Sequence, residues 1–543
     1  MFDRPDSEVR KQDYLNLFIL FILCAVLFFF RLGDRPLWDV DEGMHAATSK
    51  DMVLTGDWVT PRVNGENFYD KTPLFNWFAA LSFMAFGFTE FAARLPAAIL
   101  GLATVFVTYA LGRRLFGSTA GLLGGVVLAT SPEFIILSRS VVHDIALAFF
   151  VSLALVFFYA AFSSERHRRL NLMLFYGAAG LAVLAKGPIG VLLPALIIGL
   201  FLLIRGKLGF LKEMDIGRGI LVFLLVAAPW YVFISIRNTD YASYFFLKQN
   251  LGNFLSKQQA THPQPVYYYV PVLLGGMLPW SFFLPLAISG PLKNGLKQAD
   301  SGVLFLVCWF SVIFLFFTAA SSKLDTYILP AFPAVALLIA RVWHELVTVP
   351  TPGMRRGAGY SFVPLFILFL AGILIILVIQ PPVRKLQMQY GVSLHDLFGF
   401  WLAVTGIPII AFLFFYFRRY WAAFASLAAT FVVGILLFII AYAPTMDPYR
   451  STKDLAKEMD TILPPGEQLV FFKKLGDTSL FYTNRRARVI HSEEQLLDYL
   501  ASSKRALCVI ERVEFDRHEK VAKSSYVLRE EGNKLLISNR PAS

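Results

Sequence analysis

The sequence predicts a mostly helical membrane protein that crosses the bilayer about thirteen times, with interfacial helices and a small C-terminal α/β domain. Of its 543 residues, 56% are hydrophobic and only 16% are charged, and the mean hydropathy is +0.58. Soluble domains carry about 25% charged residues. Apolar runs of about 18 residues or more recur between Leu15 and Tyr442. From about Thr445 the composition becomes polar. These observations exclude an ordinary soluble globule.

The apolar runs define the predicted spans one by one. They lie near residues 14–31, 94–112, 119–137, 145–162, 170–185, 188–204, 218–236, 267–289, 302–319, 326–345, 360–380, 395–417 and 421–442. We interpret the first run as a span and not as a signal peptide. No small-residue cleavage site follows it, and the charged stretch Trp38–Glu42 comes next.

Basic residues occur in short clusters between the apolar runs. The clusters are Arg113-Arg114, Arg166 with Arg168 and Arg169, Arg205 with Lys207, Lys293 with Lys297, Arg355-Arg356 and Arg418-Arg419. The positive-inside rule places such clusters in the cytoplasm, so we expect the N-terminus inside and the C-terminus outside. The net charge of +12 therefore reflects membrane topology, and we expect no nucleic-acid partner. The three cysteines show no disulfide or metal-binding pattern.

The predicted first external loop, residues 32–93, collects most acids of the N-terminal third of the chain. Within it, 73–88 is apolar but too short for the roughly 20 residues that a crossing needs. We therefore expect an interfacial or re-entrant helix there. The stretch Glu42–Leu54 predicts a second helix, ended by Gly56, whose N-terminus Asp41 can cap.

The chain is divided into a transmembrane domain, 1–444, and a small domain, 445–543. The small domain is predicted to contain a helix at 451–461, a strand near 468–472, a helix near 492–503, a strand near 506–511 and a hairpin around 531–533. It shows no Gly-rich phosphate-binding pattern and no catalytic cluster. A lid, acceptor-docking or stabilising role is expected for it.

The predicted topology gathers the polar chemistry at the external ends of the spans. The residues that fall there are Asp41, Glu42, His45, Lys71, His143, Asp144, Lys186, His262, Lys323 and Tyr327. Asp41 and Glu42 are the main candidates. One alternative is that they only cap and begin a helix. The other is that a carboxylate orients or deprotonates an acceptor, helped by partial desolvation at the membrane surface.

The other candidates also have a structural alternative. Lys71 could extend toward the headgroups, or it could neutralise a phosphate leaving group. Asp144 could be a helix cap, or it could pair with the Asp41 site in holding a sugar or a cation. Lys323 and Tyr327 lie four residues apart and share a helix face if the helix begins early, where both could contact phosphate. Lys186 is interpreted first as part of a tight turn.

Several motifs resemble those of one family. The stretches WDVDEGMHAATSKDMVLTGDWVTPRVNG, FYDKTPLFNW and KLDTYILPAFPAVALLIA, together with Asp144 and the small external C-terminal domain, are similar to the polytopic glycosyltransferases with the C-superfamily fold. Within these the chain resembles the branch of the lipid A aminoarabinose transferase and, more distantly, the protein O-mannosyltransferases. The likeness extends over essentially the whole chain, and its motifs are specific in combination.

The resemblance implies transfer of one sugar, with inversion, from a polyprenyl-phosphate donor to a lipid or other cell-envelope acceptor. The reaction is expected at the periplasmic face of the bacterial inner membrane. The catalytic acids would be Asp41 and Glu42, with Asp41 on the acceptor side. Lys71 and Tyr327 would contact the donor phosphate, and Asp144 would lie near the sugar.

The loop departs from the aminoarabinose transferases at Met44 and His45, where they carry an arginine and a tyrosine. We therefore expect His45 to bind substrate and to bear on substrate choice. Cationic and hydroxyl groups can stabilise a phosphate leaving group, so no cofactor is required, while a divalent metal between Asp41 and Asp144 stays open.

Two other functions were weighed. A transporter or flippase for a lipid-linked saccharide would place ionisable residues near the membrane midplane, often between inverted repeats, and the sequence shows neither. A noncatalytic scaffold organised by the C-terminal domain would leave the acids between Leu37 and Trp77 unexplained.

Overall fold

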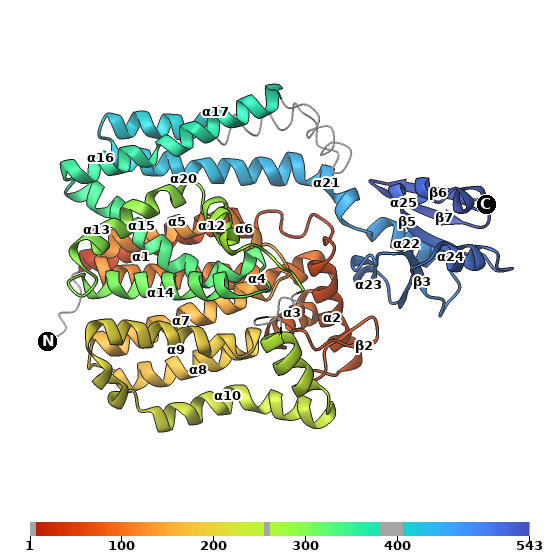
Figure 1. Ribbon diagram of the computed structural model, residues 1–543, viewed down its shortest axis with the longest axis horizontal. Helices are drawn as coiled ribbons and strands as arrows, with labels where there is room; N and C mark the ends of the chain where they lie inside the picture. The colour runs from red at the N-terminus through yellow and green to blue at the C-terminus, as the bar shows by residue number, and fades with distance from the viewer. Residues whose placement is uncertain (1–6, 253, 255–260, 379–405, 542–543) are drawn as a thin grey trace.

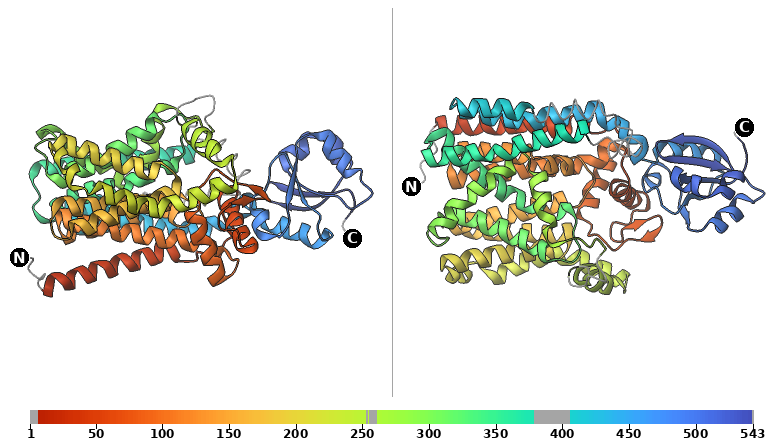
Figure 2. Two further views of the ribbon diagram at one scale, coloured as in Figure 1. Left: turned by 90° about the horizontal axis from the view of Figure 1, so that it is seen from below. Right: turned by 45° about the horizontal axis from the view of Figure 1, so that its top comes forward.

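The computed structural model describes residues 7–252, 254, 261–378 and 406–541. Long helices lie side by side in a bundle, and the C-terminal domain follows at one end of it (Figure 1). The first helix starts at the opposite end of the bundle, as Figure 2 also shows. The chain is mainly helical with a small C-terminal sheet, as the sequence predicts.

The bundle is built from helices that agree in position with the predicted spans. They are α1 (Ser7–Cys24), α4 (Glu90–Phe116), α5 (Ser118–Ala129), α6 (Pro132–Ser138), α7 (Asp144–Ser163), α8 (Arg168–Lys186), α9 (Ile189–Arg205), α10 (Ile216–Arg237), α12 (Tyr269–Gly276), α13 (Leu284–Asn294), α14 (Ser301–Ala319), α15 (Phe332–Thr348), α17 (Val363–Val378) and α20 (Tyr420–Leu437). A further helix, α16 (Pro352–Ser361), lies between α15 and α17, where no span was predicted. Short helical segments, among them η6 (Asp325–Ala331) before α15, join or extend them.

Seven of the described helices are long and apolar enough to cross a membrane, and nine if each of two bent pairs counts as one crossing. The expectation of about thirteen crossings stays a prediction. Most of the predicted span near 395–417 lies outside the described residues.

Two predicted spans are bent. The run near 119–137 divides into α5 and α6, which meet at 71°, and the run near 267–289 divides at an angle of 109°. Pro132 begins α6, and Pro279 lies at the second break. Proline has no N–H to continue the preceding helix, which explains breaks at these positions.

The C-terminal domain contains a five-stranded sheet in the order β4-β3-β5-β7-β6. Its strands are β3 (Leu469–Phe472), β4 (Ala487–Ile490), β5 (Leu507–Glu511), β6 (Tyr526–Glu531) and β7 (Lys534–Ser538), with helices α21 (Ala443–Arg450), α22 (Lys453–Ile462), α23 (Thr478–Tyr482), α24 (Glu493–Leu500), α25 (Arg512–Arg517) and α26 (Glu519–Lys523). β4, β3 and β5 are parallel, and β6 and β7 form an antiparallel hairpin. The expected helices, strands and hairpin are confirmed. The short β4 and α23 were not predicted.

The first loop lies between the bundle and the C-terminal domain (Figures 1 and 2). It contains α2 (Asp41–Thr55), β1 (Arg62–Val63), β2 (Glu66–Asn67) and α3 (Leu74–Phe86). Both predicted helices are confirmed, including the end of α2 at Gly56 in a left-handed conformation. The predicted cap is wrong: α2 begins at Asp41 itself, and no side chain caps it. Asp41 therefore lies in the first turn, where its carboxylate can still favour the helix dipole.

Polar contacts attach α2 to the C-terminal domain. The Lys50 ammonium donates to the carbonyls of Phe481 (2.7 Å) and Thr483 (3.1 Å). The amide of Thr478 donates to the Asp39 carboxylate at 2.7 Å. The C-terminal domain is therefore in direct contact with the segment that carries the predicted catalytic acids.

Candidate functional site

A cavity of about 570 Å³ opens where the start of α2, the segment before α3, the end of α8 and the third loop meet; the third loop is the segment between α10 and α12. We call it the Asp41 cavity. Its polar lining consists of Asp41, Asp70, Lys71, Thr72, Lys186, Tyr244, Lys248, Gln249, Asn250, Thr261, His262, Ser322 and Tyr327, and its apolar lining of Met44, Phe68, Ile189, Phe245, Phe254, Phe317, Ala320 and Leu324. The structure thus brings together Asp41, Lys71 and Tyr327, three residues that the sequence singled out.

Asp41 presents its carboxylate to this cavity from the first turn of α2. Partial burial raises the pKa of the Asp41 carboxyl, and the positive charge of Lys71 opposes that shift. A carboxylate with a raised pKa accepts a proton more readily than an exposed aspartate does. Asp41 therefore has the position and the electrostatic setting of a proton acceptor.

Asp144 begins α7 and forms an ion pair with Lys186, the last residue of α8. The Lys186 ammonium also lies over the ring of Tyr327, 4.2 Å from its centroid. Lys186 therefore lines the Asp41 cavity as a charged group, beyond the turn role expected first. Gly187, with φ of 79°, supplies the turn immediately after it.

The third loop contributes a wall of aromatic and amide side chains. The Tyr244 hydroxyl donates to the Asp70 carboxylate at 2.6 Å, which links this loop to the segment before Lys71. The Lys248 ammonium lies 5.2 Å from the Tyr244 ring centroid and lines the cavity. His262, which the sequence placed at the external end of a span, also lines the cavity.

Glu42 points away from the Asp41 cavity and is buried. Its carboxylate accepts two hydrogen bonds of 2.8 Å from the Arg94 guanidinium. The amides of Trp38 (3.0 Å) and Val141 (3.2 Å) also donate to it. The bonds from Arg94 and Val141 hold the loop to α4 and to the segment before α7, and the bond from Trp38 lies within the loop. The catalytic role of Glu42 stays a prediction, and its contacts favour a positioning role.

His45 is also removed from the cavity. Its side chain is only 2% exposed, and its ring lies 4.4 Å from the ring of His143. Burial lowers the pKa of His45 to about 3, so the imidazole is neutral. The preceding residue, Met44, lines the Asp41 cavity, and His45 does not. Substrate binding by His45 stays a prediction.

Lys323 lies beside the cavity but is only 4% exposed. Its ammonium donates to the carbonyls of Ala320 (2.5 Å) and Gln264 (3.2 Å). The 3₁₀ helix η6 begins at Asp325, so Lys323 precedes it and the expectation of one helix face shared with Tyr327 is wrong. The Lys323 contacts join two loops, and its predicted contact with a phosphate stays a prediction.

The described residues contain no group of three or more His, Cys, Asp or Glu side chains placed to hold a metal ion. Asp144, one of the two carboxylates between which a metal was left open, is paired with Lys186. No step proposed below depends on a metal.

Comparison with known proteins gives a consistent result. Residues 70–233 match the family model described as dolichyl-phosphate-mannose-protein mannosyltransferase. An undecaprenyl phosphate-alpha-4-amino-4-deoxy-L-arabinose arabinosyl transferase of Aeromonas salmonicida is 33% identical over 61% of this chain and 60% of its own. An uncharacterised protein of Aquifex aeolicus is 28% identical over 83% of both chains.

The fold is also shared with a solved structure. ArnT from Cupriavidus metallidurans, bound to undecaprenyl phosphate, superposes with a TM-score of 0.79 at 23% identity, over 96% of this chain and 97% of ArnT. The same protein without ligand gives a TM-score of 0.77. The arrangement of the bundle, the loop and the C-terminal domain is therefore shared with this solved structure.

Proposed function

We infer the function of this chain from the family to which it belongs, the polytopic glycosyltransferases that include the aminoarabinose transferases and the protein mannosyltransferases. The chain is a membrane glycosyltransferase that takes a sugar from a polyprenyl-phosphate carrier. We propose that it acts in the bacterial inner membrane, with the reaction on the periplasmic side and a cell-envelope glycolipid, glycan or protein as acceptor.

The observation that carries this proposal is the composition of the Asp41 cavity. The Asp41 carboxylate shares it with the cations Lys71 and Lys186 and the hydroxyl of Tyr327. Phosphate requires cationic and hydroxyl donors, and a transferred sugar requires an acidic group on its acceptor side. The cavity supplies both requirements in one place.

The apolar lining suits a lipid-linked donor. Phe245, Phe254 and Phe317 line the same cavity as the cations. A polyprenyl chain partitions into the bilayer, and its phosphate is then presented at the level of the headgroups. We propose that the first isoprene units pack on the aromatic side chains while the phosphate meets Lys71, Lys186 and Tyr327.

In the proposed reaction an acceptor oxygen attacks the anomeric carbon of the donor sugar from the side opposite the phosphate. The new carbon–oxygen bond forms as the bond from the anomeric carbon to the phosphate oxygen breaks. The bonding electrons leave with the polyprenyl phosphate, whose added negative charge Lys71 and Lys186 stabilise. A hydroxyl acceptor gives its proton to Asp41, whereas an acceptor that is already anionic is only oriented by Asp41.

Asp144 has a positioning role in this proposal. Its ion pair with Lys186 holds the ammonium beside the Tyr327 ring. The pair joins the starts of α7 and η6 to the end of α8, and so fixes the phosphate-binding side of the cavity relative to Asp41.

The first prediction is that Asp41→Asn lowers sugar transfer by at least about 100-fold, as expected when a general base is removed. The assay uses full-length protein in detergent, a cell-envelope glycolipid extract and two donors in turn, polyprenyl-phosphate-linked 4-amino-4-deoxy-L-arabinose and mannose. Asp51→Asn, an equal change of charge on the same helix outside the cavity lining, is the control. Normal transfer by Asp41→Asn would remove Asp41 from the mechanism.

A further inference from the structure

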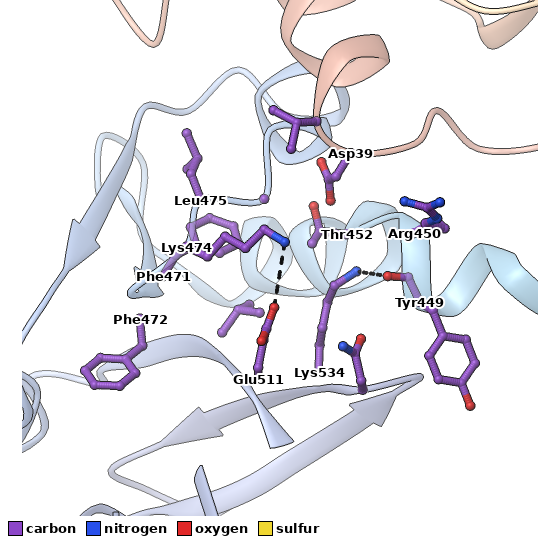
Figure 3. Close-up of a pocket in the computed structure, with 14 residues that line it drawn as sticks. Asp39, Tyr449, Arg450, Thr452, Phe471, Phe472, Lys474, Leu475, Glu511 and Lys534 are labelled. Atoms are coloured by element: carbon purple, nitrogen blue, oxygen red, sulfur yellow. Dashed lines mark hydrogen bonds and ion pairs between the residues drawn. The ribbon is translucent and has the colours of Figure 1, made fainter. Parts of the chain in front are cut away.

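A second cavity, of about 360 Å³, lies between the C-terminal domain and the first loop. We call it the junction cavity. Figure 3 shows its lining, with Asp39 of the loop on one side and Lys474, Glu511 and Lys534 of the domain facing the same space. None of the residues that line it lines the Asp41 cavity.

The junction cavity occupies the position in the sheet where parallel α/β domains bind ligands. β3 has β4 on one side and β5 on the other, so the chain leaves β3 for β4 and then crosses back to β5. The carboxyl ends of β3 and β5 are therefore a topological switch point, outside which ligands commonly bind. Phe471 and Phe472 of β3, and Val509 and Glu511 of β5, line the cavity.

The lining carries three cationic side chains, Lys474, Lys534 and Arg450, against two carboxylates, Asp39 and Glu511. The Lys534 ammonium donates to the carbonyls of Tyr449 (3.0 Å) and Ser451 (2.8 Å). Lys474 is 3.9 Å from Glu511, its side chain 65% exposed. The cavity is therefore positive overall, with an accessible ammonium at its edge.

Hydroxyl-binding groups complete the lining. The Asp39 carboxylate accepts a hydrogen bond from the Thr478 amide at 2.7 Å. The Asn533 side-chain oxygen is buried and has no hydrogen-bond partner within the described residues. Carboxylate and amide oxygens accept hydrogen bonds from sugar hydroxyls, and ammonium groups bind phosphate or carboxylate.

The position of this cavity connects it to the reaction. Asp39 and Val40 line the junction cavity, and the next residue, Asp41, lines the other cavity. A molecule held against Asp39 is thus held against the segment that enters the first turn of α2. The domain residue Asp477 is close enough to both acids that their charges help to raise its pKa.

We propose that the junction cavity binds an anionic saccharide, the phosphorylated or carboxylated headgroup of the acceptor, with its anionic group at Lys474 and Lys534. That the ligand is the acceptor rests on the proposed function. That the ligand is an anionic saccharide rests on the lining of the cavity alone. The C-terminal domain then selects the acceptor, while the Asp41 cavity binds the donor.

Binding is tested with glucose 1-phosphate as probe and full-length protein in detergent. We expect Lys474→Gln to weaken binding of the probe at least about tenfold, as loss of a charge-assisted contact should. Lys473→Gln is the matched control, because it changes the charge equally at the neighbouring residue, which pairs with Glu514 outside the cavity. Methyl glucoside and inorganic phosphate should both bind more weakly than the probe.

Absent binding, or equal binding in the two variants, overturns the site. Inorganic phosphate that binds as tightly as glucose 1-phosphate overturns the saccharide assignment.

Transfer kinetics then separate the two sources of the ligand, an acceptor headgroup and a free anionic sugar. For an acceptor headgroup, Lys474→Gln raises KM for the accepting glycolipid and leaves kcat and the donor KM unchanged. An unchanged acceptor KM overturns the acceptor assignment and leaves a site for a free anionic sugar.

The two proposals fail in different ways. If wild-type protein transfers no sugar but binds glucose 1-phosphate through Lys474, the proposed function fails and the binding site stands. If Asp41→Asn abolishes transfer and Lys474 has no effect on binding or KM, the proposed function stands and the junction cavity is only a domain contact.

Discussion

Two neighbouring acids at the start of α2 have opposite surroundings. Asp41 faces a cavity that it shares with Lys71, and it accepts no described capping hydrogen bond. Glu42 is buried and accepts four hydrogen bonds, two of them from Arg94. Successive residues of an α-helix point about 100° apart, so adjacent side chains enter different environments. An acidic pair in a sequence can therefore divide into one reactive group and one structural group.

The different surroundings of Asp41 and Glu42 suit different tasks, Asp41 for proton transfer and Glu42 for holding the fold together. A carboxylate that can accept a proton must have accessible lone pairs, and the Asp41 carboxylate lines an open cavity and has no hydrogen bond found among the described residues. A carboxylate that accepts a full set of hydrogen bonds from a buried guanidinium instead holds its partners in place. Arg94 also donates to the carbonyls of Leu32, Arg35 and Pro36, so that one side chain organises the entry into α2.

The largest expected effect comes from breaking the buried ion pair between Glu42 and Arg94. Arg94→Met leaves the Glu42 charge buried without its partner, which costs about 3–5 kcal/mol in comparable cases. We expect a clear loss of thermal stability of the detergent-solubilised protein, followed by tryptophan fluorescence. Asp41→Asn should leave the melting temperature essentially unchanged, because no buried pair is broken.

A double variant tests whether the lost stability comes from the buried charge. Glu42→Gln together with Arg94→Met removes both charges, and we expect it to be more stable than Arg94→Met alone. If Arg94→Met melts like the wild type but transfers no sugar, the ion pair acts in the chemistry and the division between the two acids is wrong.

The next effect is a change in the pH dependence of sugar transfer, which should follow the ionisation of Asp41. Burial raises the pKa of Asp41 and Lys71 lowers it, so that loss of Lys71 raises the pKa further. The reaction needs ionised Asp41 when the acceptor is a hydroxyl. We therefore expect the acid limb of kcat to move to higher pH in Lys71→Gln. Profiles are measured at saturating donor, because Lys71 is also proposed to bind the donor phosphate.

Lys248→Gln is the matched control for this profile. It removes an equal charge from the same cavity, yet Lys248 is not among the main charges that act on Asp41. Its acid limb should stay near that of the wild type. If the acid limb of kcat shifts equally in both variants, the limb depends on the total charge of the cavity and not on the ionisation of Asp41.

The helices of the bundle could be predicted from the sequence because lipid imposes long apolar runs that need no tertiary information. The first loop could be singled out because charged residues in such a chain remain only where water or substrate reaches them. Asp41, Lys71 and Tyr327 were found in this way, and all three line one cavity.

Other features depend on contacts between distant segments. The pairing of Lys186 with Asp144 joins residues 42 positions apart, and nothing local to Lys186-Gly187-Pro188 distinguishes a cation from a turn. The different surroundings of Asp41 and Glu42 depend on Arg94, a residue in the next long helix. The switch point beside the junction cavity depends on β4, whose four residues gave too weak a pattern to be recognised.

The smallest expected effect involves a third acid, Asp477, which begins the turn before α23 and lies near Asp39. Burial, together with the charge of Asp39, raises the pKa of Asp477 to about 7. An unfolded chain releases this proton near pH 4. The folded state therefore binds the proton more tightly, and its stabilising contribution is full below about pH 4 and is lost as the pH rises to about 7.

Asp477→Asn keeps the shape and removes the titration. We expect its free energy of unfolding to fall less than that of the wild type between pH 5 and pH 8, by roughly 2–3 kcal/mol, and we measure this as a smaller drop in melting temperature. Asp498→Asn, an exposed position on α24, is the control and should follow the wild type. Parallel curves for all three proteins would mean that Asp477 is ionised already at pH 5. The charges of Asp39, Asp41 and Asp477 would then coexist at this contact, and the cations of the junction cavity would be needed to hold the domain in place even without a ligand.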